Sequence, residues 1–187
     1  MHRKFLYELL EKYEPSPEEE PFKKEMVSFI TNNPDCFERT LKVGHITASC
    51  WLIKYDNSKA LLTHHTKLDK WFQLGGHCDG DSDVLAVALK EASEESGLEN
   101  IQPVTNGIFD IDIHLIPDTP KEKAHYHYDV RFLLRATKNE PLKRSHESKS
   151  LKWVGKDISE LPTQSRSVVR LFNKWIAYSM PTSAILY

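Results

Sequence analysis

The stretch from Gly75 to Leu98, GGHCDGDSDVLAVALKEASEESGL, constrains the chain more than any other, because it reads as a loop followed by one helix. Glycines and aspartates crowd its first part and disfavour a helix before about residue 82. Asp81 or Ser82 is the expected N-cap, and Asp83 would lie in the first turn, where a negative charge opposes the positive end of the helix dipole. Gly97 is expected to end the helix, because the residue that follows a helix often takes a positive φ.

Two stripes run along this expected helix. The first would face a core and contains Leu85, Ala88, Leu89, Ala92 and Ser96. Beside it, Glu91, Glu94 and Glu95 have the i, i+3 and i+4 spacing that gathers carboxylates together. Such a cluster is usually a solvated face with basic partners, but the i−4 and i+4 neighbours of Glu91 are Val87 and Glu95. Like charges at this spacing repel unless a cation lies between them, and Mg²⁺ takes a few carboxylates together with substrate phosphates. The spacing therefore favours a site for a hard divalent cation.

This stretch resembles the Nudix box of the Nudix hydrolase superfamily. That pattern is a glycine, five residues, a glutamate, seven residues, Arg-Glu, an aliphatic residue, any residue, Glu-Glu, any residue, a glycine and an aliphatic residue. The positions in register are Gly76, Glu91, Glu94, Glu95, Gly97 and Leu98. Three positions depart from it, since Ser82 replaces the first glutamate, Lys90 replaces the arginine and Ala92 replaces a larger aliphatic residue. The similarity runs from about Leu41 to about Tyr178.

The resemblance implies an α/β fold, an α/β/α sandwich with a mixed sheet, over residues 41–187, preceded by an N-terminal helical extension at 1–40. It implies that Glu91, Glu94 and Glu95 hold Mg²⁺ or Mn²⁺ and help to activate water, with the carbonyl of Gly76 as a further ligand. Lys90 would orient one of the glutamates through its charge. The implied activity is that of a pyrophosphohydrolase, which cleaves a nucleoside diphosphate linked to another moiety or a nucleoside triphosphate.

Two further residues have more than one interpretation. Glu147 lies in the loop SHESKSLKWV, where related Nudix sequences often carry an acid that binds metal or acts as a base, but an ordinary loop glutamate fits as well. His77 follows the two glycines and could contact a phosphate or make a structural hydrogen bond.

The segment His125–Leu134 alternates between two faces, as a strand does. His125 and His127 share one face at a spacing compatible with a transition metal, but no cysteine or third histidine is clearly placed to complete such a site. We therefore favour a polar face near the substrate, or an exposed one, over a zinc site. Arg131 continues this face and could hold a phosphate or pair with Asp129.

Other periodic segments predict the remaining elements. Helices are expected at 3–13, from Pro17 to about residue 31, and at 163–179, and strands at 44–55, 60–64, 104–115 and 151–154. The apolar face of the first helix would contain Phe5, Leu6, Leu9, Leu10 and Tyr13. The first two helices form an N-terminal arm, for which packing against the domain is favoured over a dimer contact or a lid.

Composition excludes several other classes. With a formal net charge of −2, the chain of 187 residues has no basic field for a nucleic acid polymer. No stretch approaches the ~20 apolar residues of a membrane span, and the N-terminus is too charged for a signal peptide. The three cysteines are expected to be reduced thiols in a cytoplasmic protein. The expected partner is a nucleotide-type small molecule, and a homodimer is one option.

Two other functions stay open. The departures at Ser82 and Lys90 suggest a non-catalytic Nudix-fold module that only binds a nucleotide. The isopentenyl-diphosphate isomerases share the implied fold but use a cysteine near the glycine loop, whereas here Cys78 comes after His77.

Overall fold

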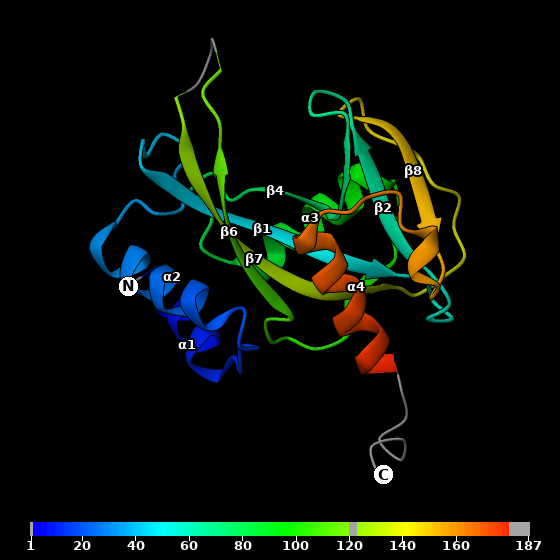
Figure 1. Cartoon of the computed structure of the whole chain (residues 1–187), viewed down its shortest axis with the longest axis horizontal. Coiled ribbons are helices and arrows are strands. Elements are labelled where there is room, and N and C mark those ends of the chain that lie inside the picture. Colours follow the sequence, from blue (N-terminus) through cyan, green and yellow to red (C-terminus); the bar gives the residue numbers. More distant parts are fainter. Residues whose placement is uncertain (1, 120–122, 180–187) are drawn as a thin grey trace.

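The computed structural model describes residues 2–119 and 123–179, which form an eight-stranded mixed sheet with helices on both sides (Figure 1). The helices are α1 (Lys4–Lys12), α2 (Glu20–Asn32), α3 (Val84–Ser96) and α4 (Arg166–Ser179), with a short 3-10 helix, η1 (Ile158–Glu160). The strands are β1 (Gly44–Ile53), β2 (Ala60–His65), β3 (Lys70–Phe72), β4 (Leu74–His77), β5 (Ile101–Pro103), β6 (Asp110–Ile116), β7 (His125–Ala136) and β8 (Ser148–Val154). The predicted α/β class is confirmed. No helix in the described part of the chain has the length and apolar character that a membrane crossing requires.

Two long strands form the centre of the sheet. β1 and β7 run in parallel from Gly44 opposite Tyr126 to Ile53 opposite Arg135. On its other side, β1 pairs with β4 over its middle and with β2 at its end. β7 likewise pairs with β6 over its first part and with β5 at its end. The sheet is therefore continuous at its centre and divides toward its edges, where β8 and β3 both pair with β2.

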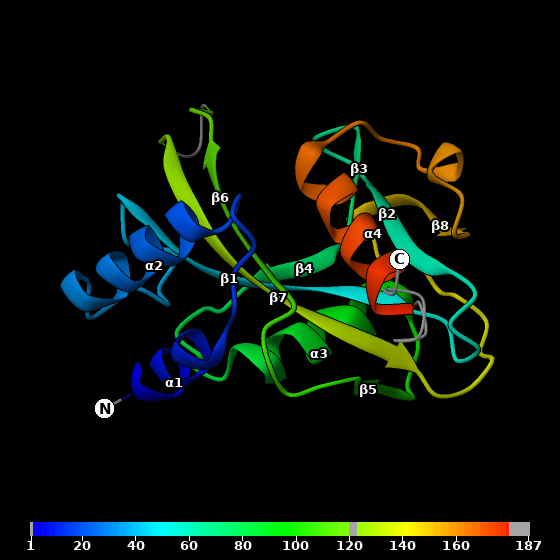
Figure 2. The same cartoon turned by 60° about the horizontal axis from the view of Figure 1, so that its bottom comes forward.

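Alternation along the strands gives the sheet two apolar faces. On one face, β1 buries residues such as Ile46 and Leu52 against α3 and the N-terminal arm. On the other face, Trp51 packs with Trp175 of α4 in a second cluster of buried side chains. Figure 2 shows α3 and α4 on opposite sides of the sheet. This is the layered arrangement that the family resemblance implied.

The N-terminal arm packs into the larger core, as its apolar pattern predicted. Leu6 of α1 and Met26 of α2 are fully buried in that core, and the ring of Phe29 stacks on Tyr128 of β7 with centroids 3.8 Å apart. Phe5 was expected on the same face but is 41% exposed. The second helix begins at Glu20 rather than near Pro17.

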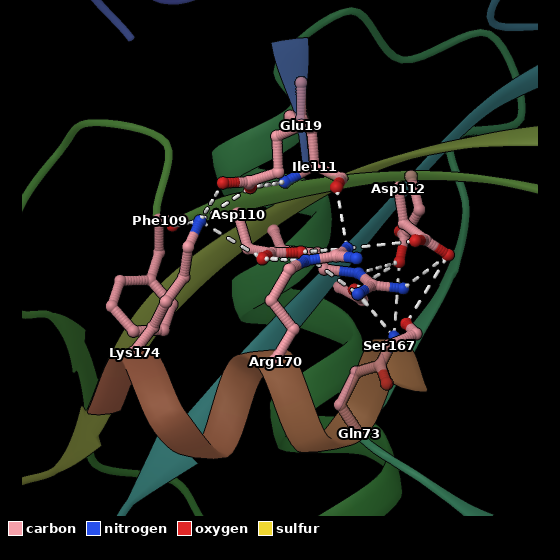
Figure 3. Close-up of polar contacts among 12 residues, drawn as sticks. Glu19, Gln73, Phe109, Asp110, Ile111, Asp112, Ser167, Arg170 and Lys174 are labelled. Carbon is pink, nitrogen blue, oxygen red and sulfur yellow. Dashed lines mark hydrogen bonds and ion pairs between the residues drawn. The ribbon is translucent and has the colours of Figure 1, made fainter. Parts of the chain in front are cut away.

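A buried network of ion pairs connects β6, β7 and α4 (Figure 3). Arg131 is 1% exposed, and its guanidinium contacts Asp129 at 2.7 Å, Asp110 at 3.1 Å and Asp112 at 3.2 Å. Arg170 of α4 donates to Asp110 at 2.8 Å and to Asp112 at 2.9 Å. Each buried charge therefore has partners of the opposite sign, without which its desolvation would be strongly unfavourable.

The same network attaches the arm to the domain. Lys174 of α4 donates to both carboxylate oxygens of Glu19 at 2.6 Å and lies 3.2 Å from Asp110. Burial alone would raise the pKa of Glu19, but hydrogen bonds from Lys174, Ser16 and Tyr13 lower it to about 2. Glu19 is fully buried just before α2.

We predict that Glu19→Gln lowers the free energy of unfolding at pH 7 by about 3 kcal/mol, because it breaks a buried ion pair. The pKa of Glu19 is lowered in the folded state, so its stabilisation is present above the unfolded pKa near 4.5 and is lost as the pH falls toward about 2. Urea unfolding over this pH range should show the wild type and the variant converging.

The matched control is Glu20→Gln, because that neighbouring side chain is exposed, whereas Glu18 pairs with Arg170 of the network. We expect it to change the free energy of unfolding by no more than about 0.5 kcal/mol. Equal effects of the two substitutions would contradict the anchoring role of Glu19.

Candidate active site

Helix α3 begins and ends through local chemistry. The carboxylate of Asp83 accepts a hydrogen bond from the backbone N–H of Ala86 at 3.0 Å, so Asp83 is the N-cap rather than Asp81 or Ser82. At the other end Gly97 takes a φ of 71°, as predicted. These caps set which residues of α3 face the sheet.

The glycine pair before the helix forms a strand rather than the expected loop. Gly75 lies opposite Ser49 and Gly76 opposite Ala48 in the β1–β4 ladder. A Cβ atom on Gly76 would stand 2.6 Å from the carboxylate of Glu91, so a larger residue here would displace this carboxylate from its position against β4. Glycine at this position thus lets the strand approach α3 closely enough for backbone and carboxylate to meet.

Glu95 and Glu91 are the two inward glutamates of α3. Glu95 is only 7% exposed, and its carboxylate accepts a hydrogen bond from the N–H of Gly75 at 3.3 Å. Burial raises the pKa of Glu95 to about 8, and the nearby charge of Glu91 acts in the same direction. Burial also raises the pKa of Glu91, against the opposing effect of Lys90. Two desolvated carboxyl groups side by side form a site that a cation would stabilise.

Glu94 and Lys90 lie at the outer edge of this site. The side chain of Glu94 is 60% exposed. The ammonium group of Lys90 lies 3.5 Å from Glu91 and 3.7 Å from Glu94, so it contacts both carboxylates at the solvent boundary. This is the placement expected for a cation that orients a glutamate.

Glu147 reaches the site from a distant part of the chain. It precedes β8, and its carbonyl accepts a hydrogen bond from the N–H of Thr66 at the end of β2 at 2.8 Å. Its side chain is 58% exposed, and its charge raises the pKa of both Glu91 and Glu95. The structure therefore brings Glu147 together with the glutamates of α3.

The other expected binding residues lie on the opposite face of the sheet. His77 lies opposite Thr47 in the β1–β4 ladder, one residue beyond Gly76, so its side chain points away from Glu91. His127 is on the same face as His77, with ring centroids 5.1 Å apart. Of the two roles expected for Arg131, the pairing with Asp129 is the one observed, and its buried guanidinium is occupied by aspartates.

Sequence reasoning missed His45, which lies opposite His127 in the parallel ladder of β1 and β7. Burial lowers the pKa of His45 to about 4, and the neighbouring imidazoles of His77 and His125 act in the same direction. The only available signal was the strand pattern around His45, because the register between two strands cannot be read from either strand alone. His125 is buried rather than exposed.

Comparison with known proteins places this geometry in a family. A family model described as NUDIX domain matches residues 44–172. An Ap4A hydrolase from C. elegans, solved as a binary complex, is similar with a TM-score of 0.58 and 16% identity over 71% of this chain and 96% of that chain. A NUDIX-family hydrolase from Clostridium perfringens gives a TM-score of 0.53 and 24% identity, with 72% and 97% covered.

The E. coli dihydroneopterin triphosphate pyrophosphohydrolase is also similar, with a TM-score of 0.55 and 13% identity over 72% of this chain and 96% of that chain. Among curated protein sequences, none matches this chain at a significant level. At these identities the solved structures establish the fold, while the family model covers well over half of the sequence and contains the glutamate cluster. The protein therefore belongs to the NUDIX family.

Proposed function

We propose that this protein is a Mg²⁺-dependent pyrophosphohydrolase, with Mn²⁺ as a second competent ion. Its substrate is a nucleoside diphosphate linked to another moiety, or a nucleoside triphosphate. The observation that carries the proposal is the convergence of two α3 carboxylates on the backbone of β4, with the charge of Glu147 acting on both of them. Two similar proteins are named for Ap4A and dihydroneopterin triphosphate. The NUDIX domain of NrtR from Shewanella oneidensis, similar with a TM-score of 0.52 and 15% identity over 82% of this chain and 98% of that chain, was solved with ADP ribose. These names support a substrate of this class.

The donor set fits a hard divalent cation. All of its groups are oxygens, and burial raises the pKa of Glu91 and of Glu95, which no buried cation neutralises among the described residues. We assign Glu91, Glu94 and Glu95 to the ion, with the carbonyl of Gly76 as a further ligand. When bound, Mg²⁺ neutralises charge on the diphosphate oxygens and lowers the pKa of a water molecule at the site.

Residues of the chain orient the glutamates and accept the proton of the attacking water. The N–H of Gly75 orients Glu95, and Lys90 holds Glu91 from the solvent side. Glu147 is the exposed acid of the group, so it can reach an attacking water and accept its proton. His77, His127 and Arg131 are left out of this assignment, because they lie on the other face of the sheet or in the interior.

We predict that Glu91→Gln and Glu95→Gln each lower kcat for phosphoric anhydride hydrolysis by about 100-fold or more, because each removes an anionic group from the reaction centre. The measurement is release of phosphate-containing products from a panel of nucleotide derivatives in the presence of Mg²⁺. Glu99→Gln is the matched control, because Glu99 is exposed beyond the end of α3, and it should keep the wild-type rate. If Glu91→Gln and Glu95→Gln both kept that rate, the proposed function would be wrong.

Glu147→Gln tests the assignment of the proton acceptor. We expect kcat to fall by about 100-fold while the Mg²⁺ concentration for half-maximal activity stays the same, since Glu147 is not among the assigned metal ligands. A variant with unchanged kcat that needs much more Mg²⁺ would instead make Glu147 a ligand.

The raised pKa of Glu95 predicts that replacing this residue increases the stability of the metal-free protein while it lowers activity. Because its pKa rises from 4.5 to about 8 on folding, this carboxyl reduces stability progressively as the pH increases through that interval. In metal-free protein at pH 8, Glu95→Gln should therefore increase the free energy of unfolding by about 2 kcal/mol. Urea unfolding measures this, with the exposed Glu94→Gln expected to show no gain. A loss of stability in Glu95→Gln would contradict the interpretation.

The alternatives separate in the same assays. A module that only binds would show calorimetric binding of a nucleotide with no turnover under either Mg²⁺ or Mn²⁺. For the isomerase alternative, the structure offers no supporting thiol, because Cys78 is buried and burial raises its pKa far above the ordinary value.

A further inference from the structure

Histidines gather on the face of the sheet opposite α3. The members of this histidine cluster are His45 on β1, His77 on β4, His114 on β6, and His125 and His127 on β7. Strand pairing brings them together: β1 and β7 place His45 opposite His127, and β6 places His114 opposite His127. No contact within a single segment would assemble this group from four strands.

Three of the rings converge most closely. The ring centroids of His45 and His127 are 4.7 Å apart, those of His45 and His77 are 5.0 Å apart, and those of His77 and His127 are 5.1 Å apart. One ring nitrogen from each of the three lies within 4.8 Å of the other two. Three imidazole nitrogens this close together are a typical ligand set for a transition metal ion.

The environment of His45 gives a separate reason to expect a ligand at this cluster. It is fully buried, and among the described residues neither of its ring nitrogens has a hydrogen-bond partner. A buried polar atom without a partner is costly, and such atoms in a native structure call for an explanation such as an ion. A metal ion bound between the three rings would give one of the His45 nitrogens a partner.

His125 contacts the edge of this group. Its Nδ1 donates a hydrogen bond to the carbonyl of Lys123 at 2.7 Å, because a carbonyl can only accept. Its Nε2 lies 3.3 Å from Nε2 of His127. A hydrogen bond between the two rings explains that contact, but it gives His45 no partner.

We propose that His45, His77 and His127 bind Zn²⁺ at a second metal site, separate from the glutamates of α3. Neutral imidazole suits zinc and similar transition metals, whereas Mg²⁺ requires oxygen ligands. The two sites lie on opposite faces of the sheet, because adjacent residues of β4 point in opposite directions. His77 and His127 are partly exposed, which gives the ion a route from solvent.

Such an ion would connect β1, β4 and β7. β4 has only four residues, and its ladder is with β1. A metal ligand at His77 would therefore stabilise the strand whose preceding residues contact the glutamates.

The test uses the full chain with any affinity tag removed and metals stripped by a chelator. Zn²⁺ is titrated by calorimetry in excess Mg²⁺, which occupies the oxygen ligands. We expect one equivalent to bind and the Tm to rise with Zn²⁺ concentration. His77→Ala and His127→Ala should each weaken binding by about 100-fold or more, since loss of a ligand costs at least as much as loss of its supporting contacts.

Two controls separate this site from others. His146→Ala removes a histidine whose side chain is 93% exposed, and Glu95→Gln alters only the glutamate site, so both should bind Zn²⁺ as the wild type does. Unchanged Zn²⁺ affinity in His77→Ala and His127→Ala would overturn the proposal. Should a variant fail to fold, X-ray absorption at the zinc edge of the wild-type protein decides the matter: imidazole ligands support the site, and oxygen ligands alone refute it.

Discussion

The buried ion network around Asp110 is the constraint on which the rest of the structure depends. A carboxylate in the interior is tolerated only when cations are held against it, and here Arg131 and Arg170 meet that need from β7 and α4. Lys174 extends the network to Glu19, so the position of the arm follows from the same electrostatic requirement. The arm therefore contributes buried side chains to the core of the domain, although it lies outside the segment that the family model matches.

Local patterns predicted contacts within one element but not contacts between elements, and the expectation for Glu147 came from the family resemblance alone. The clustering of Glu91 and Glu95 follows from helical spacing, and the shared face of His125 and His127 follows from strand alternation. Glu147 joins the site only because β8 pairs with β2, and His45 meets His127 only through the parallel register of β1 and β7. Such registers are set by the packing of the whole sheet, so no local pattern encodes them.

Two of the three departures from the family pattern, at Ser82 and Lys90, have structural explanations. Ser82 precedes the N-cap of α3, so it lies outside the helix that carries the cluster. Lys90 contacts both Glu91 and Glu94, which a single ammonium group can do without the fork of an arginine. The glycine pair was expected in a loop because glycine is common in turns. In β4, glycine has no side chain, so the strand can lie directly beside the carboxylates of α3.

Because residues alternate between the two faces of β4, this one short strand contributes to both the glutamate site and the histidine cluster. Gly76 faces the glutamates, and its neighbour His77 faces the other histidines. A deletion or insertion of a single residue in this strand would exchange the two faces, placing an imidazole against Glu91 and a bare backbone among the rings. Changes in the length of β4 are therefore tolerated only in steps of two residues. Among relatives of this chain, we expect the spacing between Leu74 and His77 to vary less than the identity of the exposed residues.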